Sequence, residues 1–154
     1  MRLIPAAAIL VWLAVMAFFA FGVAPAAFSS LEREAAGRFV SAVFPRYYAV
    51  GTALGLSALL AAVMRGLGTG RSVGEWIGLG LLALMLALTL YSWLVVLPGA
   101  HAAREAMRQA GAAAGAASSE ALAFARLHRL SGILNATVMG AGVLFLILEE
   151  VRRR

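Results

Sequence analysis

Four long apolar runs constrain this chain more than any other feature. They cover, approximately, residues 3–27, 47–64, 75–97 and 130–148. About 20 apolar residues form a helix long enough to cross the ~30 Å hydrocarbon core of a bilayer. Within that core only helices and closed barrels satisfy their own backbone hydrogen bonds. The runs therefore predict an all-α, integral membrane four-helix bundle, formed as one domain over residues 1–154.

The composition also favours the membrane class. Hydrophobic residues make up 63% of the chain and charged residues 13%, whereas about a quarter of a soluble domain is charged. The chain has no cysteine, which excludes disulfides and thiolate metal sites. The net charge is +6, and all 13 basic residues are arginine. Arginines that flank apolar spans meet anionic head groups, so we expect the lipid bilayer, and not nucleic acid, as the partner.

The first run has one feature of a secretory signal peptide, the small-residue sequence Ala24-Pro25-Ala26. The apolar stretch before it is longer than the ~7–15 residues of a signal core, so we expect a span. Pro25 is expected to stop or kink the helix because proline lacks a backbone N–H.

Two polar segments separate the spans and are expected to be amphipathic helices at the membrane interface. In the first, residues 29–46, apolar residues recur every four positions, which also fits an extension of the second span. A capping box at Ser29 to Glu32 predicts a helix start, and Pro45 suits the first turn of the next helix. The second segment, residues 99–129, follows Pro98-Gly99, which is expected to close the third helix. Its low-complexity part, residues 110–119, is typical of a flexible linker.

Two pairs of glycines at G-x-x-x-G spacing predict close helix packing, either inside the bundle or between copies in a homo-oligomer. They are Gly51 with Gly55 and Gly74 with Gly78.

The start of the fourth span carries a polar stripe. His128, Ser131 and Asn135 are three and four residues apart, so they share one helix face, which should point into the bundle because hydrocarbon offers no hydrogen-bond partners. One interpretation is structural, with hydrogen bonds to other helices. Another is a ligand pocket or a polar pathway for a transporter. A third is haem or metal ligation by His128, together with His101, although no cofactor is predicted outright.

Three arginines are candidates for contacts with lipid phosphate or an anionic ligand near this stripe, with ordinary head-group contacts as the alternative. They are Arg46, Arg126 and Arg129. An enzyme is disfavoured. His128 and Ser131 lie one turn apart on the same helix, and no third group is visible to orient them.

Three motifs give the chain a resemblance to a known family. They are Gly22-Val-Ala-Pro25-Ala-Ala-Phe28, Phe44-Pro45-Arg-Tyr47-Tyr48 and Phe124-x-x-x-His128-x-x-Ser131-x-x-x-Asn135. In this order the chain resembles the transmembrane protein 205 family and its bacterial relatives of unknown function. The resemblance implies a four-span fold and no established reaction.

The expected location is a bacterial inner membrane, crossed several times. With four spans both termini lie on one side, and the two sides carry almost equal numbers of arginine. Because arginines in short flanks weigh most in orientation, the sequence favours cytoplasmic termini.

Overall fold

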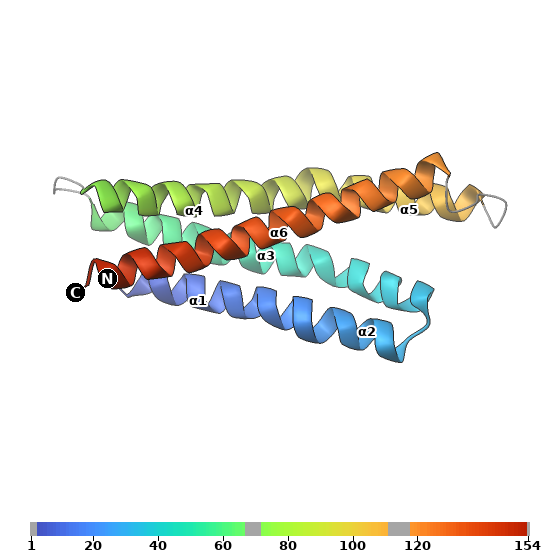
Figure 1. Cartoon of the computed structure of the whole chain (residues 1–154), viewed down its shortest axis with the longest axis horizontal. Coiled ribbons are helices and arrows are strands. Elements are labelled where there is room, and N and C mark those ends of the chain that lie inside the picture. The colour runs from blue at the N-terminus through green and yellow to red at the C-terminus, as the bar shows by residue number, and fades with distance from the viewer. Residues whose placement is uncertain (1–2, 67–71, 111–117, 154) are drawn as a thin grey trace.

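The computed structural model describes residues 3–66, 72–110 and 118–153, and within these ranges the chain is helical, with no strand. Four long helical rods lie side by side along one axis (Figure 1). Each is long and apolar enough to cross a membrane: Ile4–Ser30, Arg33–Arg65, Val73–Gln109 and Ser119–Val151. The predicted all-α membrane bundle is therefore confirmed, and the pattern is that of a multi-pass membrane protein.

Two rods are single α-helices and two contain a π-helical turn. The uninterrupted ones are α3 (Arg33–Arg65) and α6 (Ser119–Val151). The first rod consists of α1 (Ile4–Ala17), the π-helix η1 (Phe18–Val23) and α2 (Ala24–Ser30). The third consists of α4 (Val73–Tyr91), the π-helix η2 (Ser92–Val96) and α5 (Leu97–Ala110).

Prolines do not end these rods, which corrects two predictions. Pro45 lies inside α3 and does not open a helix, and Pro98 with Gly99 lies inside the third rod and does not close it. The π-helices explain two of the sites, since η1 ends two residues before Pro25 and η2 ends two residues before Pro98. A proline ring crowds the carbonyl of the preceding turn, and a wider π turn at that place relieves the crowding.

The segment expected between the first two spans is mainly an extension of the second. Helix α3 begins at Arg33 without a side-chain cap, so the predicted capping box at Ser29 does not form. The Ser29 hydroxyl instead donates to the carbonyl oxygen of Ala26 in its own helix. Helices of 33 residues, such as α3 and α6, are about 50 Å long and extend well beyond the hydrocarbon core. Most of the linker predicted at 110–119 lies outside the described residues.

The middle of the bundle is packed around Trp12 of α1. Gly51 and Gly55 of α3 make room for this ring, because an added Cβ would lie 2.7 Å and 2.9 Å from its atoms. Gly78 faces Phe145 of α6, where a Cβ would lie 3.5 Å from the ring. A Cβ at Gly74 would lie 3.1 Å from the side chain of Arg152. The glycine pairs thus face other helices of the same chain, and a homo-oligomer stays a prediction.

Candidate functional site

A cavity of about 280 Å³ lies at the end of the bundle opposite the chain termini. At this end α2 packs on α3 and α5 packs on α6, and the two pairs diverge (Figure 1). Residues from all four rods line the cavity. We call this the cavity end.

The deeper wall of the cavity is aromatic. Phe19 of η1 contacts Phe44 and Tyr47 of α3, with ring centroids 5.2 Å and 5.0 Å apart. Tyr48 lies beside Tyr47 at 5.2 Å, with the rings nearly perpendicular. Tyr47 and Tyr48 follow Phe44 by three and four residues, so both lie on the same side of α3 as Phe44. The result is an apolar surface with two phenol hydroxyls.

The polar stripe of α6 forms the facing wall, since His128, Ser131 and Asn135 all line the cavity. The Tyr47 hydroxyl donates a hydrogen bond of 2.7 Å to Asn135 Oδ1. The Tyr48 side chain lies close to Ser131 and to Ser92 of η2. The Tyr47–Asn135 bond therefore joins α3 to α6 at the cavity wall, and Tyr48 lies next to the third rod.

His128 and His101 lie nearer the mouth. The His128 ring stacks on Phe124 of the same helix, with centroids 6.1 Å apart and planes 18° from parallel. His101 lines the same cavity from α5. Within the described ranges, no three histidine, cysteine or acidic side chains gather closely enough to hold a metal ion. Both histidines thus lie on the cavity wall.

Arg104 of α5 lies at the neck of the cavity. One guanidinium nitrogen, Nη1, donates to Ser41 Oγ at 3.1 Å, and Nη2 donates to the backbone carbonyl of Glu34 at 3.2 Å. Gly37 is the reason the guanidinium fits, because a Cβ there would clash with it. Both bonds cross from α5 to α3 and fix the arginine between the two helices.

A second, polar depression of about 230 Å³ adjoins the neck, and we call it the vestibule. Its lining residues are Glu34, Arg38, Ser41, His101, Arg104, Glu105 and Arg108. Ser41, His101 and Arg104 line both the vestibule and the cavity. The apolar cavity thus adjoins a charged mouth, and Arg104 lies between them.

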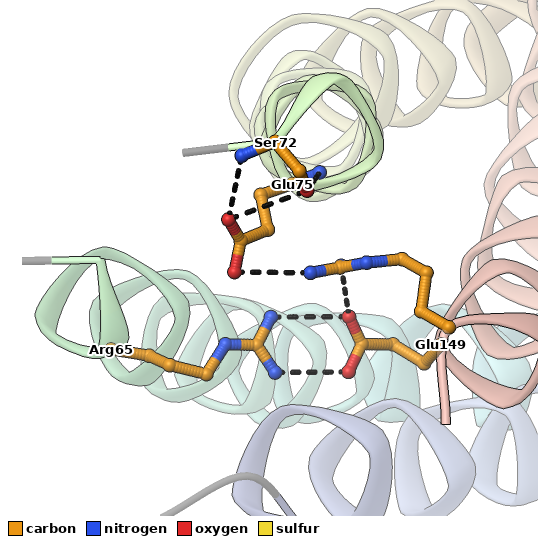
Figure 2. A network of polar contacts seen from close by, with 5 residues as sticks. Arg65, Ser72, Glu75 and Glu149 are labelled. Carbon is orange, nitrogen blue, oxygen red and sulfur yellow. Dashed lines mark hydrogen bonds and ion pairs between the residues drawn. The ribbon is translucent and has the colours of Figure 1, made fainter. Parts of the chain in front are cut away.

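The opposite end of the bundle holds a network of ion pairs, which we call the closed end (Figure 2). Arg65 of α3 binds both carboxylate oxygens of Glu149 on α6, at 2.9 Å and 3.1 Å. Arg152 forms ion pairs with Glu149 at 2.8 Å and with Glu75 of α4 at 3.0 Å. Glu75 also completes a capping box with Ser72 at the start of α4. Three rods are tied together here.

The structure places the other predicted site residues away from the cavity. Arg126 and Arg129 line a separate shallow depression on α6, and Arg46 donates to the backbone carbonyl of Ala42. Gly22 and Pro25 belong to η1 and α2 but are not among the lining residues. The arginine that the structure brings to the stripe is Arg104.

Sequence reasoning missed Arg104 because it lies in a polar segment interpreted as an interfacial connection. A signal was present in the prolines. Pro25, Pro45 and Pro98 lie in three apolar or amphipathic segments, and in the structure the helices that contain them surround the cavity. Irregular helix at membrane depth is tolerated where it is buried or lines a cavity, so prolines in three neighbouring segments could have indicated a cavity.

The model of a family described as a domain of unknown function (DUF4149) matches residues 7–109. The matched region contains the first two resemblance motifs and Arg104, whereas the motif from Phe124 to Asn135 lies beyond it. No curated protein and no solved structure matches the chain.

Proposed function

We propose that this chain, which belongs to the DUF4149 family, binds a small amphiphilic molecule in the cavity at one face of the membrane. One observation carries the proposal: an aromatic cavity of about 280 Å³ adjoins a polar mouth at Arg104. Ligand pockets are typically mostly apolar with a few convergent polar groups, and they measure about 300–1,000 Å³. This cavity has that character, and its volume is just below this range.

The position of the cavity in the membrane supports an amphiphile. Its aromatic wall lies where the apolar runs of the first and second spans meet, at Phe19 and Tyr47. Its mouth is built from the parts of α3 and α5 that are rich in charged residues and lie beyond those runs. A molecule with an apolar body and a polar end would find each part matched at the depth it prefers in a bilayer.

Binding is better supported than passage through the bundle. A transport path would have to continue from the cavity past the packed core at Trp12 and Met85, both buried, to the closed end. There it would meet the Glu149 carboxylate, whose side chain is only 7% exposed and is held by two arginines. Opening that end would separate desolvated charges, which is unfavourable. We therefore favour a binding protein over a transporter.

Filling the cavity tests the proposal. Gly132 lies at the exposed edge of the cavity wall, and a Cβ there meets nothing within 4 Å, so a larger side chain can be introduced beside the cavity without a clash. Gly140 on the same helix has equally free surroundings and does not line the cavity. The probe is the methyl ester of dansylated undecanoate, a neutral amphiphile whose fluorescence rises in an apolar site. The protein is held in phosphatidylcholine nanodiscs, with nanodiscs lacking the protein as the background.

We expect saturable binding to the wild type, loss of it in Gly132→Phe, and retention in the matched control Gly140→Phe. Equal binding in all three proteins, or a signal no larger than in nanodiscs lacking the protein, would contradict the proposal. An absorption spectrum of the same samples tests the haem alternative. A Soret band that is lost in His128→Ala would replace the amphiphile with haem as the occupant.

The proposal extends to the location of the protein. We propose that the chain is similar to transmembrane protein 205 and lies in a bacterial inner membrane, with both termini in the cytoplasm. Because the cavity end is opposite the termini, cytoplasmic termini would make the cavity open on the outer face of that membrane. Reporter fusions at the C-terminus, active only in the cytoplasm or only outside it, decide the orientation.

A further inference from the structure

We infer that the cavity takes a single-chain amphiphile with an anionic head group, a carboxylate or a phosphate, and that Arg104 binds this head group. The inference rests on the proposed function and adds the charge and the shape of the ligand.

The first observation is that Arg104 has no acidic partner. Among the described residues, Arg104 and Arg65 are the arginines of intermediate burial, and only Arg65 contacts a carboxylate. The two acidic side chains that line the vestibule form ion pairs with other arginines: Glu34 pairs with Arg38 at 2.7 Å, and Glu105 pairs with Arg108 at 3.4 Å. Arg104 contacts only a hydroxyl and a backbone carbonyl. Within the described part of the chain its positive charge therefore has no carboxylate paired with it.

The second observation is the position of that charge. Arg104 lines both the vestibule and the cavity, so an anion bound to it would have water on one side and the aromatic wall on the other. Its two hydrogen bonds to α3 hold the guanidinium in place and leave further N–H donors unused. Arginine presents its donors in a planar fork that fits carboxylate and phosphate oxygens. His101, which lines the same two spaces, adds a further polar contact.

The third observation concerns size. A cavity of about 280 Å³ is small for a ligand pocket, which favours one acyl chain over the two chains of a phospholipid. The matching ligand class is a fatty acid or a single-chain phosphate ester.

The test compares two probes that differ by one charge. In phosphatidylcholine nanodiscs, and in alkaline buffer where the acid is ionised, dansylated undecanoate is titrated beside its methyl ester. We expect the wild type to bind the acid at least about tenfold more tightly than the ester, since hydrogen bonds to charged groups are strong. The variant Arg104→Gln should bind the acid and the ester equally, because the preference for the acid is lost, and Arg104→Lys should recover part of the preference. Arg126→Gln, which removes the same charge from the outer face of α6, should keep the full preference.

Ester binding reports the fold in every variant, so a loss of both probes in Arg104→Gln alone would make Arg104 a structural residue and overturn the inference. Equal affinities for acid and ester in the wild type would also overturn it, while leaving the proposed function intact. If neither probe binds the wild type, the proposed function itself is contradicted. Two competitors identify the source of the anion. Displacement by dodecanoate is expected, whereas equally effective displacement by inorganic phosphate, or by phosphatidylglycerol in the nanodisc, would overturn the single-chain ligand.

Discussion

The two ends of the bundle each hold a half-buried arginine, and the two arginines have different partners. This difference distinguishes an end that stabilises the fold from the end proposed to bind a ligand. Arg65 meets both oxygens of Glu149 at the closed end, whereas Arg104 at the cavity end meets a serine hydroxyl and a backbone carbonyl. An arginine with a bidentate carboxylate partner has its charge compensated, so it holds two helices together and does not attract an anionic ligand. An arginine with neutral partners beside a cavity keeps its charge available.

The same two helices build both ends. Helix α3 carries Arg65 at one end and Tyr47 towards the other, and α6 carries Glu149 and Asn135 in the corresponding places. The contacts Arg65–Glu149 and Tyr47–Asn135 therefore bridge the same pair of helices at two levels. One is ionic and one is neutral, which allows their contributions to stability to be compared directly.

The largest effect is expected at the closed end. Glu149→Gln removes the charge that Arg65 and Arg152 share, and it leaves the half-buried Arg65 without its counter-ion. Breaking a buried pair from one side destabilises proteins by about 3–5 kcal/mol. Thermal unfolding in detergent should show a large fall in Tm. The control Glu105→Gln breaks a pair whose side chains are 52–58% exposed, and it should change stability by less than about 1 kcal/mol. Similar effects of the two variants would contradict the difference between the ends.

An intermediate effect is expected from the neutral bridge. Tyr47→Phe removes the donor of the 2.7 Å hydrogen bond and leaves Asn135 Oδ1 without it. Hydrogen bonds between membrane helices contribute about 1 kcal/mol, so Tm should fall measurably but far less than in Glu149→Gln. Tyr91→Phe, at an exposed tyrosine, serves as the control. A loss as large as that of Glu149→Gln would show that the cavity end supports the fold as strongly as the closed end.

The smallest effect on stability is expected at Gly37. A Cβ in Gly37→Ala would clash with the guanidinium of Arg104, which is the far end of a flexible side chain and can move away. Stability should change by less than about 1 kcal/mol. The preference for dansylated undecanoate over its methyl ester should fall, because the arginine leaves the neck. An unchanged preference would mean that the exact position of the guanidinium does not matter for binding.

Much of the fold could be predicted from local sequence, because span length and apolar content directly limit what a membrane segment can form. The stripe of His128, Ser131 and Asn135 could be placed on one face by helix geometry alone, and the structure puts all three residues on the cavity wall. Their role in binding stays a prediction. The continuity of the third rod could not be predicted, because the normal rules end a helix at Pro98. The continuity of α3 was only one of two alternatives, because proline is common in the first turn of a helix and Pro45 suited a helix start.

The partners of the charged residues were beyond the reach of the sequence. Arg65 and Glu149 are 84 residues apart, and Arg104 reaches a serine 63 residues away. Whether an arginine meets a carboxylate or a hydroxyl depends on the lateral order of the helices, which no local pattern specifies. For the same reason Arg46, Arg126 and Arg129 were plausible candidates at the stripe, and Arg104 was not considered.

Native mass spectrometry of the protein released from its own membrane tests the central claim most directly. The account predicts that the wild type and Gly140→Phe carry an adduct with the mass of one single-chain anionic amphiphile. It also predicts that Gly132→Phe and Arg104→Gln have lost this adduct. The same adduct in all four proteins, or none in the wild type, would contradict the claim that the cavity end is a binding site.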